Sequence, residues 1–190
     1  MTPQAPARAA PAERRAATIA RVAGALDGVL HEFVETRDGM PTLIVPRDGL
    51  VEVLSRLKSR ASFEQATFVT AVDHLPATPR FEVVHQLWSL THADRVRLKT
   101  RIAVDAAWVP TCTHLWPGAA FMERECYDMF GIHFEGHHNL RRLLMPEEYE
   151  HHPLRKEFPH QGIEPDRLYR AWEKGRREEF FERRAKEDSK

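Results

Sequence analysis

The chain has 190 residues, with 28 Lys and Arg against 28 Asp and Glu, so its formal net charge is zero. This balance argues against a general binder of nucleic acid or anionic lipid, which would carry a basic excess. The two cysteines, Cys112 and Cys126, are too few for an iron–sulfur cluster and too far apart for an ordinary structural zinc site. No apolar run approaches the roughly eighteen residues that a membrane-spanning helix needs, so any membrane association would depend on partners.

Residues 1–17 combine Ala, Pro and Arg with a single acid, and this composition predicts a disordered tail. An Arg-rich, acid-poor start is also typical of an organellar transit peptide, but the segment contains no serine. Thr18 stands where it could cap a helix. The apolar residues of that helix repeat at helical spacing: Ile19, Val22, Ala23, Leu26 and Leu30.

Two short strands are expected at residues 31–36 and 42–45, on either side of a turn at residues 37–39. Asp48 is then placed to cap a second helix. The inner face of this helix is apolar and consists of Leu50, Val53, Leu54 and Leu57. A third apolar strand is expected at residues 67–72.

The clearest strand pattern covers residues 95–104, where apolar and basic residues alternate. Its inward positions are Val96, Leu98, Thr100, Ile102 and Val104. A period of two predicts a half-buried antiparallel strand, paired with residues 81–91 across a turn at 92–94. The expected helices and about five strands do not alternate one for one along the chain, and this order predicts an α+β fold. We expect a mostly antiparallel sheet with helices packed on one face, followed by a long irregular C-terminal extension.

A third helix is expected at residues 119–130, after the Pro117-Gly118 break, and Gly131 follows it at the position of a left-handed cap. Residues 131–163 have no sustained period, and a run of that length is usually functional or held by something else. We therefore expect residues 18–130 to fold as the domain and residues 131–163 to form an extended partner-binding segment, ordered only against a partner. Residues 164–190 are expected to form a charged C-terminal helix and tail.

Three motifs in this region carry a resemblance to a known family. They are ERECYDMFGI at 123–132, LRRLL at 140–144 and HPLRKEFP at 152–159, and TAVDHL at 70–75 and the 80–99 and 115–125 segments extend the similarity upstream. The order and spacing resemble the thirty-kilodalton subunit family of respiratory complex I, that is, the C subunit of NADH:quinone oxidoreductase. His138, Tyr149, His151 and Glu157 depart from the usual pattern.

This resemblance implies a cofactor-free structural subunit of the peripheral arm of a proton-translocating complex, without catalytic residues of its own. FMN and iron–sulfur clusters would lie in partner subunits and carry electrons from NADH to quinone. The chain would brace the quinone-reducing module against the forty-nine-kilodalton (D) subunit and the iron–sulfur subunits. It would lie on the cytoplasmic side of the bacterial membrane as a peripheral subunit.

The same resemblance implies a partner interface along the end of the third helix and the extension. Its candidate residues are Glu123, Arg124, Glu125, Tyr127, Asp128, Phe130, Gly131, His137, Leu140, Arg141, Arg142, Pro153, Leu154, Arg155, Lys156, Phe158 and Pro159. The prolines favour extended backbone before them, so Arg155 and Lys156 could reach partner carboxylates while Leu154 and Phe158 fill apolar pockets. The interleaved acids and leucines suit a protein interface better than nucleic acid.

Two alternatives remain open. One is the equivalent subunit of a membrane-bound hydrogenase, or of a complex with another electron donor, because nothing in this chain contacts NADH. The other is an independent metal-dependent hydrolase built on the histidines of the distal third: His133, His137, His138, His151, His152 and His160. His133 and His137 have the four-residue spacing of helical metal ligands. Gly136 lies between them in an irregular segment, so the favoured interpretation is that they are loop histidines bonded to backbone groups or carboxylates.

Carboxylates near the third helix could also form an acid/base pair. Glu125 lies close to the apolar face, and pairing with Arg141, Arg142 or Arg155 is the favoured interpretation. Arg124 and Asp128 are spaced for an ion pair along the helix.

Overall fold

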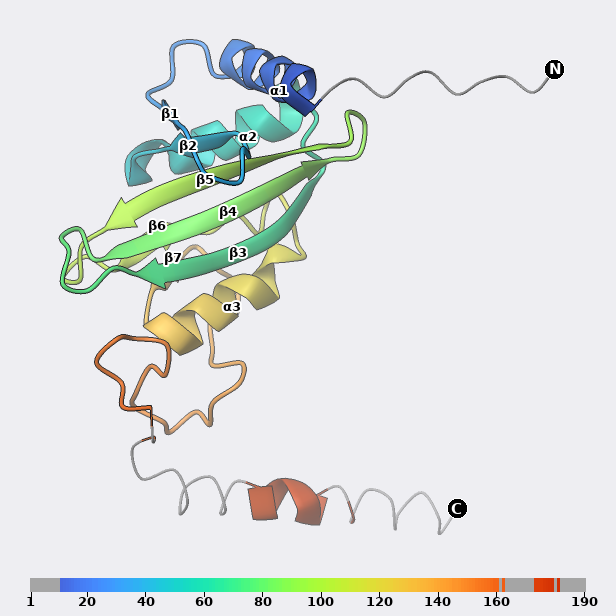
Figure 1. Ribbon diagram of the computed structural model, residues 1–190. Coiled ribbons are helices and arrows are strands. Elements are labelled where there is room, and N and C mark those ends of the chain that lie inside the picture. Colours follow the sequence, from blue (N-terminus) through green and yellow to red (C-terminus); the bar gives the residue numbers. More distant parts are fainter. Residues whose placement is uncertain (1–10, 161, 163–172, 180, 182–190) are drawn as a thin grey trace, which may run out of the picture.

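The computed structural model describes residues 11–160, 162, 173–179 and 181 (Figure 1). Its main element is a five-stranded sheet in the order β1-β2-β5-β4-β3. Only the β2–β5 pair is parallel, so the predicted mostly antiparallel sheet is confirmed. The strands are β1 (Glu32–Val34), β2 (Thr42–Ile44), β3 (Gln65–Asp73), β4 (Phe81–Ser89) and β5 (Asp94–Ile102).

The alternation along β5 places one face of the sheet in the core. Val96, Leu98 and Thr100 are fully buried, and the basic residues between them point to the other face. The antiparallel pairing of β4 with β5 is confirmed, with Val84 opposite Lys99. Val104 was expected to point inward, but the strand ends at Ile102, and the Val104 side chain is 49% exposed.

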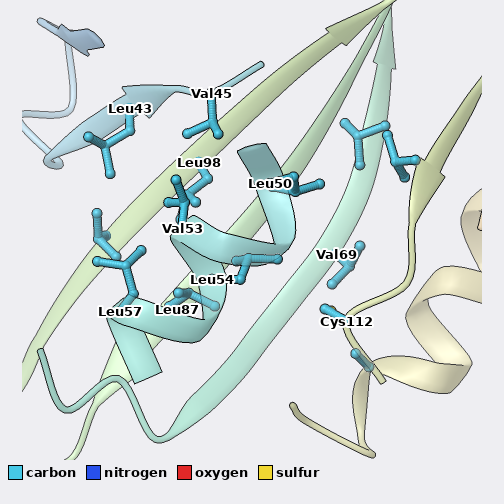
Figure 2. Close-up of a cluster of buried hydrophobic side chains, with 14 of the residues drawn as sticks. Leu43, Val45, Leu50, Val53, Leu54, Leu57, Val69, Leu87, Leu98 and Cys112 are labelled. Atoms are coloured by element: carbon cyan, nitrogen blue, oxygen red, sulfur yellow. The ribbon is translucent and has the colours of Figure 1, made fainter. Parts of the chain in front are cut away.

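Helix α2 (Leu50–Arg60) packs on the buried face of the sheet. Its four predicted inner residues have no exposed surface, and Figure 2 shows Leu54 and Leu57 beside Leu87 of β4. The predicted cap at Asp48 is wrong. A 3-10 turn, η1 (Arg47–Gly49), precedes the helix, and no side chain caps the helix N-terminus.

Helix α1 (Pro11–Ala25) begins seven residues before the predicted cap at Thr18. The Thr18 hydroxyl lies inside the helix and donates to the carboxylate of Asp94 at the start of β5, 2.6 Å away. Residues 11–17, which we expected in a tail, are therefore helical, and residues 1–10 lie outside the described part of the chain. Val22 and Leu26 are buried as predicted, whereas Leu30 lies beyond the helix and is 75% exposed.

Helix α3 (Ala119–Phe130) has the bounds that the sequence predicted. It packs against β3 and contributes to the same core as α2. In the described part of the chain α2 and α3 therefore lie on the same face of the sheet, as predicted. Two short strands not predicted from the sequence, β6 (Trp108–Pro110) and β7 (His133–Glu135), form a parallel pair next to it. The β7 strand lies inside the segment that we expected to be irregular. Residues 173–179 and Phe181 are helical, and the other residues of the expected C-terminal helix lie outside the described part of the chain.

No helix in the described part of the chain is long and apolar enough to span a bilayer.

Candidate partner interface

The C-terminus of α3 is completed by residues of the extension. Gly131 adopts the left-handed conformation, with φ 72° and ψ 26°, and its N–H donates to the Tyr127 carbonyl. The next three carbonyls, which a helix end leaves without intrahelical partners, accept hydrogen bonds from downstream groups. The Asp128, Met129 and Phe130 carbonyls are bonded by His152 Nδ1 at 2.9 Å, Leu154 N at 3.1 Å and Arg155 Nε at 2.7 Å. The extension therefore docks on its own domain in this structure, and its ordering by a partner stays a prediction.

The carboxylate of Asp128 organises the first turn of this extension. Its Oδ2 accepts from the backbone N–H groups of Leu143, Leu144 and Met145 at 2.9, 2.6 and 2.9 Å, and its Oδ1 accepts from Arg142 Nη1 at 2.7 Å. Burial disfavours the charged form of this carboxyl, but the N–H donors and the Arg142 guanidinium outweigh it and lower its pKa. Asp128 is fully buried and ionised, so it acts as an internal anchor.

A second anchor joins the extension to the β3–β4 hairpin. Arg80 holds Asp73 through two hydrogen bonds of 2.8 and 2.6 Å, and the Lys156 N–H donates to the same carboxylate at 2.8 Å. Arg80 also pairs with Glu157. The bonds from Arg80 hold the pKa of Asp73 well below its usual range. Asp73 and Lys156 are far apart in the sequence, so this contact closes a long loop.

Arg155 and Glu123 face the interior of their own chain. The Arg155 guanidinium lies 5.4 Å from the centre of the Phe81 ring. The Glu123 side chain was a candidate for the interface but is fully buried, where it accepts hydrogen bonds from Thr111 Oγ1 and from the Cys112 N–H. Glu123 therefore has no exposed surface with which to contact another protein.

Arginines of this region also bond differently from the prediction. Arg124 donates to the carbonyls of Arg141 and Arg142, at 3.1 and 2.8 Å, and the ion pair of Asp128 is with Arg142. Glu125 is exposed, and no arginine of the described residues forms an ion pair with it. Arg124 and Arg142 thus both fasten the extension to α3.

The remaining candidates differ in exposure. Glu125, Arg141, Leu154, Lys156 and Pro159 are exposed; Phe130 is buried; and the half-buried ones are Arg124, Tyr127, Gly131, His137, Leu140, Arg142, Pro153, Arg155 and Phe158. Leu144 and Leu154 expose 56% and 51% of their surface. These two leucines, together with Arg141 and Lys156, form the outer surface of the docked extension, and their contact with a partner stays a prediction.

Two histidines of the distal third, His137 and His152, form hydrogen bonds within their own chain. His137 Nε2 donates to the Ala120 carbonyl at 3.1 Å, because its Nδ1 accepts from the Asn139 N–H at 3.0 Å, and its ring stacks on His138. Both nitrogens of His137 are thus engaged. Over the described residues, no group of three or more His, Cys, Asp or Glu side chains is arranged to hold a metal ion.

The two thiols are also interior groups. Cys112 and Cys126 are buried and unpaired, and burial raises the pKa of both above the usual value for cysteine. Each is therefore a protonated core residue at neutral pH.

Sequence reasoning missed Asp73, Arg80 and Thr111 as parts of this site. Asp73 ends β3 and Arg80 is the last residue before β4, so an acid and a base at the two ends of this hairpin loop were the available signal. Nothing in the sequence linked either residue to the extension.

Comparison with known proteins places this chain in a family. The family described as "Respiratory-chain NADH dehydrogenase, 30 Kd subunit" matches residues 43–164, and the chain belongs to it. The C subunit of the NADH-quinone oxidoreductase of Citrifermentans bemidjiense is 43% identical over 129 residues, which are 68% of this chain and 79% of the relative. The C/D subunit of the NADH-quinone oxidoreductase of a Sulfurihydrogenibium species is 42% identical over 68% of this chain but only 23% of that longer protein.

Two solved structures share the fold. The trypsin-resistant fragment of Nqo5 aligns with a TM-score of 0.58 and 29% identity, over 67% of this chain and 99% of the fragment. A chain of the membrane-bound sulfane sulfur reductase, an archaeal respiratory membrane complex, aligns with a TM-score of 0.64 and 25% identity, over 76% of this chain and 85% of its own length.

Proposed function

We propose that this chain is a structural subunit of the peripheral arm of a proton-translocating NADH:quinone oxidoreductase, with no redox cofactor of its own. It braces the quinone-reducing module, on the cytoplasmic side of the bacterial membrane, by contacting the D subunit and the iron–sulfur subunits. FMN and the iron–sulfur clusters belong to those partners. None of its residues acts in catalysis.

The observation that carries this proposal is the relative named as a C/D subunit. The region similar to this chain makes up 23% of that polypeptide, so a C-type domain and a D-type domain are covalently joined there. A covalent link keeps two domains at high effective concentration, as expected for subunits that work in contact. The docked extension supplies a surface for this contact, because Leu144 and Leu154 are exposed on a segment that Asp128 and Asp73 hold in place.

A second candidate is the equivalent subunit of a membrane complex with another electron donor. The alignment with the sulfane sulfur reductase favours it, since one chain of that complex shares the fold over most of this chain. The donor is a property of the partners and not of this chain.

Affinity purification of the tagged chain from detergent-solubilised membranes, followed by mass spectrometry, tests both candidates. We expect the D subunit, the iron–sulfur subunits and a flavin- and NADH-binding subunit, together with NADH:quinone activity. A complex without the NADH-binding subunit would support the second candidate, and isolation of the chain alone would contradict both.

Absorption spectroscopy and metal analysis test the cofactor-free role separately. We expect the purified chain to contain neither iron nor flavin in stoichiometric amounts. A stoichiometric signal of either would overturn this part of the proposal.

A further inference from the structure

No helix of the described residues covers the face of the sheet opposite the core, although the Glu82 and Val84 side chains at its centre are buried. In Figure 1 no helix crosses in front of β3, β4 and β5, and in the described part of the chain α2 and α3 contribute to the core on the other side. We call this the open face. Its residues on the three long strands are Phe68, Thr70, Val72, Glu82, Val84, Gln86, Trp88, Arg95, Arg97, Lys99 and Arg101.

The open face is divided by strand into an apolar half and a basic half. On β3, Phe68 and Val72 expose 50% and 39% of their surface. On β5, all four outward residues are cations, and the register places Gln86 of β4 between Phe68 and Arg97. Neighbouring strands lie about 4.8 Å apart, so the two halves are separated by about 10 Å, close to the diameter of a helix with its side chains.

The basic half carries more positive charge than its neighbours neutralise. Glu82 accepts from Lys99 at 2.6 Å and from Arg101 at 3.3 Å, and His74 lies 3.7 Å from the same carboxylate. Arg97 pairs with Asp38 at 2.6 Å.

The remaining cation of β5, Arg95, lies over the Trp88 ring, 4.8 Å from the ring centre. The four cations of β5 therefore have two carboxylates as ion-pair partners, Glu82 and Asp38. The chain as a whole has a formal net charge of zero, so this is a local excess of positive charge. Such a local excess favours an anionic partner, and apolar side chains beside it favour a partner that is apolar on one side.

We propose that an acidic amphipathic helix of a neighbouring subunit packs on the open face, with its carboxylates over β5 and its apolar side chains over β3. A helix fits because a layer of helices on a sheet face buries an apolar stripe without needing a free strand edge. The inference rests on the proposed function, in which this chain is one subunit of a larger complex.

Site-specific photo-crosslinking in the purified complex tests the proposal. A photoreactive amino acid replaces Gln86, at the centre of the open face, and the crosslinked peptide is identified by mass spectrometry. We expect one peptide of another subunit, with Asp or Glu at helical spacing on one side and apolar residues on the other. A neutral or basic peptide, a lipid adduct, a peptide of this same chain or no adduct would each overturn the inference.

Charge reversal supplies the second arm. Arg95→Glu combined with Arg101→Glu should lower the crosslink yield at Gln86 by about tenfold or more, because like charges across an interface are strongly disfavoured. Arg60→Glu, at the exposed end of α2, is the matched control and should leave the yield unchanged. If the double reversal impairs folding, Arg95→Gln with Arg101→Gln should still lower the yield several-fold; an unchanged yield in either pair would overturn the proposal.

The two proposals fail separately. If the tagged chain does not copurify with other subunits, the proposed function is wrong. If the complex is recovered intact but Gln86 forms no crosslink to an acidic helix, only the inference about the open face is wrong.

Discussion

Replacing Asp128 with Asn should release the extension while leaving the domain folded. The Asp128 carboxylate is fully buried, and it receives three backbone N–H groups on one oxygen and Arg142 on the other. An asparagine has the same shape but must turn its NH₂ group either toward Arg142 or toward the three N–H groups. Donors then face donors whichever way the amide is oriented.

The cost follows from the loss of a buried, hydrogen-bonded charge. Removing one partner of such a pair costs about 3–5 kcal/mol, mostly because the other charge is stranded. This loss falls on the docking of the extension, so the population of undocked extension should rise roughly 150- to 5000-fold.

Hydrogen exchange of the isolated chain measures this population. In Asp128→Asn, the amides of Leu143, Leu144 and Met145 should exchange faster by that factor, whereas amides of β4 and β5 should keep their rates. Asp38→Asn, which removes an exposed ion pair with Arg97, is the control and should change neither set. Unchanged exchange at the three amides would refute the argument, and equal acceleration in β4 would show that docking is not separable from the global fold.

Three further predictions concern Gly131, His85 and Arg155. Gly131→Ala and Gly28→Ala should each cost about 1–2 kcal/mol for the left-handed conformation. In urea unfolding Gly131→Ala should cost more, because its Cβ would lie 2.5 Å from Nε2 of the His152 ring, whereas Gly28 has open space. Burial lowers the pKa of His85 to about 4. The unfolded chain therefore takes up the proton first as the pH falls through about 6.5, and His85 should lower stability by about 2 kcal/mol between about pH 7 and about pH 5, a contribution that His85→Leu should remove. Arg155→Glu should reduce the amount of assembled complex on native gels far more than the NADH:quinone turnover of each complex that forms; intact assembly with collapsed turnover would contradict this.

Local signals in the sequence were sufficient for α3 and for the β4–β5 pair. Pro117 and Gly118 break the chain before α3, and Gly131 ends it in the left-handed conformation that its lack of a side chain permits. The period of two in β5 specifies its buried face directly. For these two elements a few neighbouring residues decide the backbone geometry, and the prediction was accurate.

Contacts between distant segments were not predictable in the same way. Thr18 has the chemistry of a helix cap, but its hydroxyl bonds to Asp94, far along the chain, and the helix starts earlier. The extension has no period because backbone N–H groups of an irregular turn, and not a repeating side-chain pattern, bind it to Asp128. The sequence predicted that residues 131–163 need something to hold them, and Asp128 and Asp73 of the same chain supply such support.

The turn at residues 143–145 is held through its main chain, and this leaves the exposed Leu144 side chain free to vary. Any residue except proline can supply the N–H that Asp128 accepts, so substitution at Leu144 changes what the turn displays without changing its path. A new side chain at position 144 would contact a different partner surface, while the backbone of the turn stays the same. The position is therefore suited to engineering altered subunit pairing, with proline as the single replacement that should undo the turn itself.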